Sequence, residues 1–236
     1  MAKKKEKNPE VFKLTDENYY SREADRAYLS CSQFEDFLSC EAAAIAKLQG
    51  RYTPKKSEAF MVGNYFHTAF ESEEAHEQFV EENHDIIYQK SGKKKRAAYE
   101  QADKMIEAAM ADPYIRGLVK AEGENEKIMT GKLFGHYPWK IRLDKYISKP
   151  VRRIVDWKTL ASIRTLEWSQ ELHEKVSFVR NFHYLFQAAV YMEIEKQYTG
   201  KEKDPLFQLI CISKQDPPDK ESILLNHRQE LNLQLN

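Results

Sequence analysis

Apolar residues recur at helical spacing in the first half of the chain. In residues 30–50 they repeat every three or four positions, at Phe34, Phe37, Leu38, Ala42, Ile45 and Leu48. Ser32, with Glu35 three residues later, predicts the start of this helix as a capping box. Similar spacing predicts two further helices, over residues 57–82 and 95–111.

Strand-like alternation of apolar and polar residues follows. Residues 126–148, EKIMTGKLFGHYPWKIRLDKYIS, predict two strands joined by a turn that contains Gly135 and Pro138. In the second strand, the odd-numbered residues from Trp139 to Ile147 alternate with polar even-numbered ones, so Asp144 is expected on one face with Arg142. The next predicted elements are a strand at 152–159, a helix at 180–198 and a strand at 205–213.

This order of elements predicts an α/β or α+β fold with a mixed central sheet flanked by helices. We expect residues 1–20 to form a basic, flexible tail and residues 21–236 to form a single domain. Residues 216–236 predict a turn, a short strand and the beginning of a helix. That helix has no C-terminal signal, as in a chain truncated relative to a longer protein.

Composition narrows the possible classes of function. The 37 Lys and Arg residues balance 37 Asp and Glu residues, which argues against bulk electrostatic binding to nucleic acid but leaves a local basic groove possible. No apolar run approaches the ~20 residues of a membrane span, and the start lacks the apolar region of a secretory signal. Three cysteines, Cys31, Cys40 and Cys211, cannot supply four thiolates to a metal, and their odd number indicates a reducing cytoplasm.

Candidate chemistry first emerges at the end of the third strand, in RRIVDWKTLAS. Asp156 and Lys158 share a strand face, with Trp157 opposite, and Asp144 lies on the preceding strand. If the two strands are neighbours, two carboxylates converge, and they repel each other unless a cation lies between them. Oxygen ligands of this kind suit Mg²⁺ or Mn²⁺. Taken alone, however, the D-x-K spacing is more typical of an exposed ion pair than of a metal site.

Two helical motifs add weight to the metal-site interpretation. Gly63, His67 and Glu71 stand four residues apart and share one helix face, where Gly63 would allow close approach of another backbone. His67 is either an imidazole ligand or a hydrogen-bonded core histidine. Gln187 and Tyr191 project as a polar pair from an apolar helix, where they suit either a phosphate contact or the rim of a packed helix.

In this order the motifs resemble the RecB-type branch of the PD-(D/E)xK nuclease superfamily. That branch has a G-x-x-x-H helix, an acid at a strand end, a D-x-K strand and a Q-x-x-x-Y helix, and residues 29–213 carry all four. The segment LSCSQFEDFLSCEAAA is similar to its N-terminal helix. VDWKT and YLFQAAVYMEI are most similar to phage and prophage exonucleases related to exonuclease VIII (RecE).

The resemblance implies a restriction-endonuclease-like core and a role for each motif residue. The implied metal ligands are His67, Asp144, Asp156, the backbone carbonyl of Trp157 and Glu126, for which Glu124 is a competitor. The implied catalytic residues are Asp144, Asp156, Lys158, Gln187 and Tyr191. The implied DNA contacts are Arg142, with Ser30, Ser32, Arg22 and Arg26 around a terminal 5′-phosphate.

These roles imply a Mg²⁺- or Mn²⁺-dependent deoxyribonuclease. The resemblance favours a 5′–3′ exonuclease on linear duplex DNA in phage recombination or DNA repair. It also implies a cytoplasmic homo-oligomer, such as a ring around DNA, that works with a single-strand annealing protein. Some relatives hold an iron–sulfur cluster through one early and three late cysteines. The late trio is absent here, so no cluster is expected. An endonuclease or a non-catalytic DNA-binding module on the same fold remains the alternative.

Overall fold

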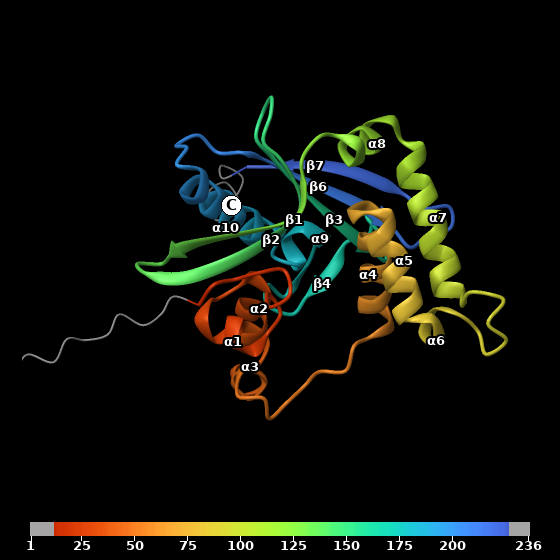
Figure 1. Ribbon diagram of the computed structural model, residues 1–236, viewed down its shortest axis with the longest axis horizontal. Coiled ribbons are helices and arrows are strands. Elements are labelled where there is room, and N and C mark those ends of the chain that lie inside the picture. Colours follow the sequence, from red (N-terminus) through yellow and green to blue (C-terminus); the bar gives the residue numbers. More distant parts are fainter. Residues whose placement is uncertain (1–11, 227–236) are drawn as a thin grey trace, which may run out of the picture.

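A five-stranded mixed sheet forms the centre of the computed structural model, which describes residues 12–226 (Figure 1). The strand order is β1-β2-β3-β6-β7; β3 and β6 are parallel, and the other neighbours are antiparallel. The strands are β1 (Glu124–Leu133), β2 (Tyr137–Ile147), β3 (Arg153–Leu160), β6 (Leu206–Ser213) and β7 (Lys220–Leu225). A separate hairpin consists of β4 (Glu167–Ser169) and β5 (Glu174–Val176). The predicted mixed α/β fold is thereby confirmed.

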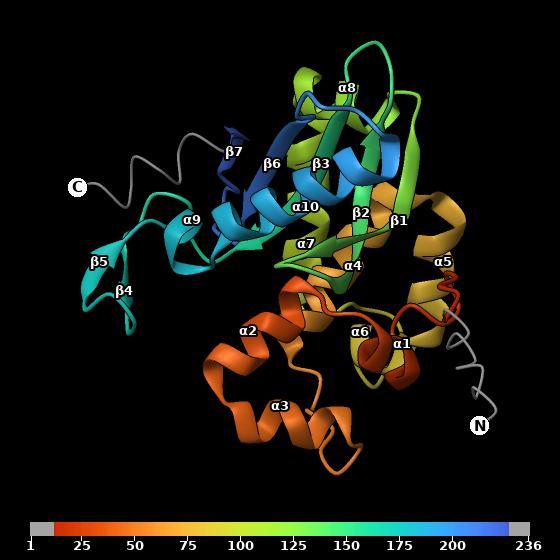
Figure 2. The ribbon, with the colours of Figure 1, turned by 90° about the vertical axis from the view of Figure 1, so that its left-hand side faces the viewer.

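Helices cover both faces of this sheet (Figure 2). The long helix α10 lies on one face and buries the larger core with β1, β2, β3 and β6. On the opposite face α4, α7 and α8 pack against β3 and β6. The helices are α1 (Arg22–Ala27), α2 (Cys31–Ser39), α3 (Glu41–Leu48), α4 (Glu58–Glu71), α5 (Glu73–Glu82), α6 (His84–Ile87), α7 (Ala97–Ala111), α8 (Pro113–Lys120), α9 (Phe178–Asn181) and α10 (Tyr184–Thr199).

Two of the predicted helices are each divided into two in the structure. The first helix has its N-cap two residues earlier than predicted, because the Ser30 side chain, and not that of Ser32, accepts the N–H of Gln33. It also stops at Cys40, whose backbone is extended, before α3 begins. The predicted 57–82 helix breaks at Ser72, which caps α5 by accepting the N–H of Ala75.

The predicted alternation of β2 fails at Asp144, and this places the carboxylate. Trp139, Ile141 and Leu143 face the α10 side, but Tyr146 also faces it and Ile147 faces the other. The opposing Glu126 of β1 has a left-handed backbone, with φ of 52°, and the pairing of the two strands skips this position. The register is the same on both sides of this position, so the strands are locally separated here without a bulge. Asp144 is therefore released from the face that it was expected to share with Arg142.

Part of the segment predicted as a tail is packed on the sheet. Residues 1–11 lie outside the described chain, but Tyr19 is only 7% exposed. The Nζ atom of the buried Lys140 donates to the Tyr19 carbonyl at 2.6 Å and lies 4.7 Å from the centroid of its ring. Folded structure therefore begins before residue 21. The helix predicted to start near the C-terminus falls in residues 227–236, outside the described chain. Within residues 12–226, no helix has the length and apolar character that a membrane crossing needs.

Candidate active site

A fork between β2 and β3 forms the centre of the site. The two strands pair only from Lys145↔Val155 to Ile147↔Arg153 and then separate. Beyond this pairing, the backbone N–H of Trp157 donates to Oδ2 of Asp144 at 2.7 Å. The N–H and C=O of one strand residue point to the same side, so the Trp157 carbonyl also faces this fork. Its indole is buried on the α4 side, where it packs 5.1 Å from the ring of Phe70.

His67 reaches the same carboxylate from α4. Its Nδ1 lies 3.5 Å from Oδ2 of Asp144, and the two side chains are 30% and 16% exposed, so the pair is largely buried but reachable from solvent. Burial alone would lower the pKa of His67, but the Asp144 carboxylate outweighs it and the net shift is upward. Burial likewise opposes ionisation of Asp144, but His67, Lys158 and the Trp157 N–H hold its pKa below the usual value.

Asp156 and Lys158 form a second, more deeply buried pair. Asp156 is 3% exposed, and its Oδ1 accepts a 2.9 Å hydrogen bond from Nε2 of Gln187 on α10. Nζ of Lys158 lies 2.7 Å from Oδ2 of Asp156, although this buried oxygen has no aligned hydrogen bond. Burial would lower the pKa of Lys158, but Asp156 and Asp144 outweigh it and hold the pKa above its usual value. The lysine therefore remains charged at neutral pH.

The donor chemistry of this site fits a divalent cation. Two carboxylates, one imidazole and a strand carbonyl are the ligand types that Mg²⁺ or Mn²⁺ accepts, and Oδ2 of Asp156 is a buried oxygen without an aligned donor. Within residues 12–226, however, no three His, Cys, Asp or Glu side chains stand close enough together to enclose a metal ion. In this arrangement the ammonium group of Lys158 provides the positive charge next to Asp156.

Glu126 lies closer to these carboxylates than its competitor Glu124 does. Its pKa is raised to about 7, first by burial and then by the negative charge of Asp144. Its Oε2 lies 2.5 Å from Nε of Arg142, whose guanidinium also packs over the rings of Tyr19 and Tyr20. Glu124 instead pairs with Lys127 at the surface, at 2.6 Å. The structure thus brings Glu126 to the site and engages Arg142 in an ion pair.

The predicted phosphate pocket is divided between two places. The Oγ atoms of Ser30 and Ser32 lie 3.2 Å apart at the start of α2, and Ser30 is occupied as the helix cap. Nε of Arg26 donates to the Leu48 carbonyl at 3.0 Å, and the guanidinium of Arg22 lies against Gly50. The two arginines therefore contact the C-terminal end of α3.

The second member of the Gln187–Tyr191 pair is placed differently from the first. The ring of Tyr191 packs 5.9 Å from that of Phe207, and burial raises its pKa well above the usual value. Sequence reasoning missed Tyr184, whose ring centroid lies 5.1 Å from Nζ of Lys158. It also missed Glu35, whose pKa is raised by burial against the opposing effects of His183 and Lys158. Both residues were assigned to helices, and helical spacing alone gave no sign of their contact with the site.

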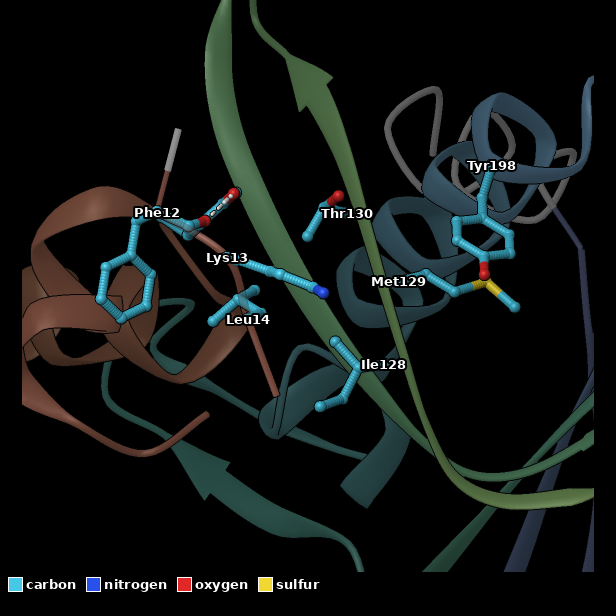
Figure 3. Close-up of a pocket in the computed structure, with 8 residues that line it drawn as sticks. Phe12, Lys13, Leu14, Ile128, Met129, Thr130 and Tyr198 are labelled. Carbon is cyan, nitrogen blue, oxygen red and sulfur yellow. Dashed lines mark hydrogen bonds between the residues drawn. The ribbon is translucent and has the colours of Figure 1, made fainter. Parts of the chain in front are cut away.

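A separate hollow of about 480 Å³ lies against the outer strand β1. Residues 12–14, Tyr28, Ile128–Thr130 and Tyr198 line it, and Figure 3 shows these side chains around the strand. None of the predicted site residues contributes to its wall. The hollow is therefore distinct from the centre built around Asp144 and Asp156.

Comparison with known proteins agrees with the geometry. The family described as a PDDEXK-like domain of unknown function (DUF3799) matches residues 30–234. A crystal structure of a candidate exonuclease from Eubacterium rectale superposes with a TM-score of 0.82 at 35% identity, over 94% of this chain and 82% of that one. The SSO0001 structure reaches a TM-score of only 0.31 at 15% identity, over 84% of this chain and 83% of that one. No curated protein matches the chain.

The matched region contains every predicted motif residue from Ser30 to Tyr191. Its fold is that of a solved neighbour at more than 30% identity over most of both chains. The predicted superfamily is thereby confirmed. The chain belongs to the DUF3799 family of PDDEXK-like domains, within the PD-(D/E)xK superfamily.

Proposed function

We propose that this nuclease is a metal-dependent exodeoxyribonuclease that hydrolyses linear duplex DNA from its ends. The observation that carries the proposal is the meeting of Asp144, Asp156, Lys158 and Gln187 at one fork in the sheet. The solved neighbour, a candidate exonuclease, supports action at ends. The 5′–3′ direction, the RecE-like character and the role in phage recombination or repair rest on the sequence resemblance.

His67, Asp144, Asp156, the Trp157 carbonyl and Glu126 would hold the metal. When bound, Mg²⁺ or Mn²⁺ supplies a water of lowered pKa and withdraws charge from the scissile phosphate. The protein groups prepare this centre. The Trp157 N–H fixes the orientation of Asp144, and Gln187 fixes that of Asp156 through Oδ1.

Lys158 serves as the charge-stabilising group in this proposal. In the metal-free protein, Asp156 and Asp144 raise its pKa and keep the ammonium protonated. It can donate hydrogen bonds to the phosphate oxygens as negative charge builds on them in the transition state. Tyr191, which keeps its proton, supports α10 behind Gln187.

The expected DNA contacts and the expected assembly belong to the same proposal. Arg142 lies beside Glu126. Once a metal cation takes the place of Arg142 beside Glu126, the guanidinium can contact a neighbouring phosphate. Ser32 and Ser30 present hydroxyls at the start of α2 for a terminal 5′-phosphate. Closure of the subunits into a ring, a single-strand annealing partner and a cytoplasmic location complete the working hypothesis.

A comparison of linear duplex DNA with closed circles tests the proposal. With Mg²⁺ or Mn²⁺ the protein should degrade the linear form and leave circles intact. Lys158→Ala should lower the rate by at least about 100-fold, because a charge that stabilises the transition state is lost. The matched control is Lys104→Ala, which removes an exposed lysine that pairs with Asp216, and its rate should equal that of the wild type.

Other outcomes would favour the alternatives. Cutting of closed circles would identify an endonuclease on the same fold. Binding of DNA without cleavage in either metal would identify a non-catalytic module. End labels on the 5′ or 3′ strand read the direction of degradation in the same experiment.

A further inference from the structure

A pair of aromatic rings leads from Lys158 toward solvent. The ring of Tyr184 lies beside the ammonium group, with its centroid 5.1 Å from Nζ. The ring of Phe182 follows at 5.9 Å between centroids, with 40° between the planes. Phe182 is 40% exposed, so one end of this pair is open while the other touches the proposed catalytic lysine.

The backbone holds the two rings together in an uncommon conformation. His183, between them, has φ of 52° in the left-handed region, which non-glycine residues enter at an energetic cost. Its carbonyl accepts the N–H of Gln187 in the first turn of α10, and its Nε2 lies 2.9 Å from Oε2 of Glu171. Contacts on both sides therefore maintain the turn. Strain of this kind is often kept where a side chain must be aimed.

The residues just before Phe182 are held in place by packing, although Phe182 is partly exposed. Just before it, α9 packs on the β4–β5 hairpin: Phe178 is 4% exposed, and Nδ2 of Asn181 donates to Glu167 at 3.1 Å. Figure 2 shows α9 and this hairpin extending from the body beyond the start of α10. The chain on either side of Phe182 is thus fixed, yet the residue itself is 40% exposed. A rigid, exposed aromatic ring is the type of surface on which nucleobases stack.

We propose that Phe182 and Tyr184 form a stacking platform for an unpaired nucleobase of the strand whose phosphate lies at Lys158. This inference rests on the proposed nuclease function and specifies the form of its DNA substrate. A base within a duplex has both faces covered by its neighbours, so it can stack on a protein ring only after it leaves the helix. The outermost pair of a blunt end leaves one face open but keeps its bases paired, so the platform as proposed takes a single-stranded or frayed end in preference to a fully paired one.

Binding to single strands in the presence of a chelator tests this platform without cleavage. Fluorescence anisotropy would compare a labelled short oligothymidylate with an abasic oligomer of the same length. The wild type should bind the oligothymidylate about tenfold more tightly, because stacking on an aromatic ring contributes roughly that factor per base. Phe182→Ala should lose this preference, and Phe182→Trp should restore it. Phe134→Ala, which removes another exposed ring, should retain it.

Three results would overturn the platform. They are equal affinity of the wild type for the two oligomers, an equal loss of affinity for both in Phe182→Ala, and failure of Phe182→Trp to restore the preference. Phe182 is partly exposed, so its variants should keep the wild-type melting temperature. The assay needs no catalysis, and a protein that prefers bases but cleaves no DNA would refute the proposed nuclease function alone.

Discussion

At the scale of single residues, the site depends on polar partners that hold buried carboxylates. Asp156 is almost without solvent contact, and Gln187 supplies the hydrogen bond to Oδ1. A buried acceptor that loses its donor retains the cost of desolvation. Gln187 is therefore both a support for the fold and a positioning residue for the proposed metal ligand.

Removal of that amide should weaken both properties. Gln187→Ala should lower the free energy of unfolding by about 1–3 kcal/mol, because Oδ1 of Asp156 is left without its donor. It should also reduce DNA cleavage. Urea denaturation and initial cleavage rates check the two effects. Gln197→Ala, on an exposed turn of the same helix, is the control and should keep the wild-type rate. A Gln187 variant with wild-type stability and rate would contradict this role.

Glu126 should make stability depend on pH in the metal-free protein. Its folded pKa of about 7 lies above the ordinary glutamate value, so the folded state holds the proton more tightly than the unfolded state. The contribution of Glu126 to the free energy of unfolding is therefore greatest at low pH, and it falls as the pH rises from about 4.5 through 7. Glu126→Gln should remove this loss. Between pH 5 and pH 8, the free energy of unfolding of the variant should therefore fall by less than that of the wild type, by on the order of 1 kcal/mol.

Chemical denaturation at the two pH values, with a chelator present, measures this difference. Glu124→Gln is the matched control, because Glu124 is more exposed and pairs with Lys127. Equal pH dependence in Glu126→Gln and the wild type would refute the assignment.

At the scale of elements, the two faces of the sheet contribute unequal parts of the site. His67 comes from α4 on one face, whereas Gln187 and Tyr184 come from α10 on the other. Asp144 joins them, because the fork lets it accept the Trp157 N–H at the separating edge of β2 and β3. The relative placement of α4 and β3 therefore matters for the proposed chemistry.

Two glycines, Gly63 and Gly123, differ in how closely neighbouring atoms approach them. The sequence suggested that Gly63 permits tight packing, but a Cβ there would meet only Thr159 Oγ1 at 3.8 Å, an ordinary contact. Gly63→Ala should keep the fold and raise stability by about 0.5–1 kcal/mol, as expected for an exchange inside a helix. Gly123→Ala should instead destabilise by about 1–3 kcal/mol, because its Cβ would lie 2.5 Å from the Tyr146 carbonyl oxygen.

Denaturation midpoints of the two variants check this contrast. Comparable losses in both would show that α4 lies closer to β3 than described. A stable Gly63→Ala protein that no longer cleaves DNA would assign the glycine to substrate contact.

Sequence patterns predicted the longer elements because their periodicity follows burial. The strand around Asp156 and the helix carrying Gln187 were expected from this signal, and so was their order. The breaks at Cys40 and Ser72 and the interrupted pairing at Glu126 were not. A single extended or left-handed residue leaves no periodic trace, so the contact of Asp144 with Trp157 required the structure.

At the scale of the whole molecule, the first described residues belong to the folded unit. Tyr19 covers the ammonium of Lys140 and accepts its hydrogen bond, and the hydroxyl of Tyr28 donates to the carbonyl of Phe12. Sequence patterns did not indicate this, because residues 12–20 form a short and mostly polar stretch. Charge and length suggested a tail, whereas two specific contacts attach residues 12–20 to the folded core.

Deletion should locate this boundary. A chain that begins at residue 21 should have a free energy of unfolding lower by at least about 2 kcal/mol than a chain that begins at residue 12. It loses a buried ring and the carbonyl acceptor of a buried cation. Urea denaturation of the two chains measures the difference. Equal midpoints would place residues 12–20 outside the cooperative unit.

The fork between β2 and β3 also gives the molecule a natural spectroscopic reporter. The Trp157 amide proton is bonded to a carboxylate oxygen, where a paired strand would offer it a carbonyl. Charged acceptors form the stronger bonds, so this proton should resonate downfield of its strand neighbours. Any ligand that draws Oδ2 of Asp144 away would move that one nuclear magnetic resonance peak. The Trp157 amide resonance of the nuclease, observed with isotope labelling, thus reports on the charge next to Asp144.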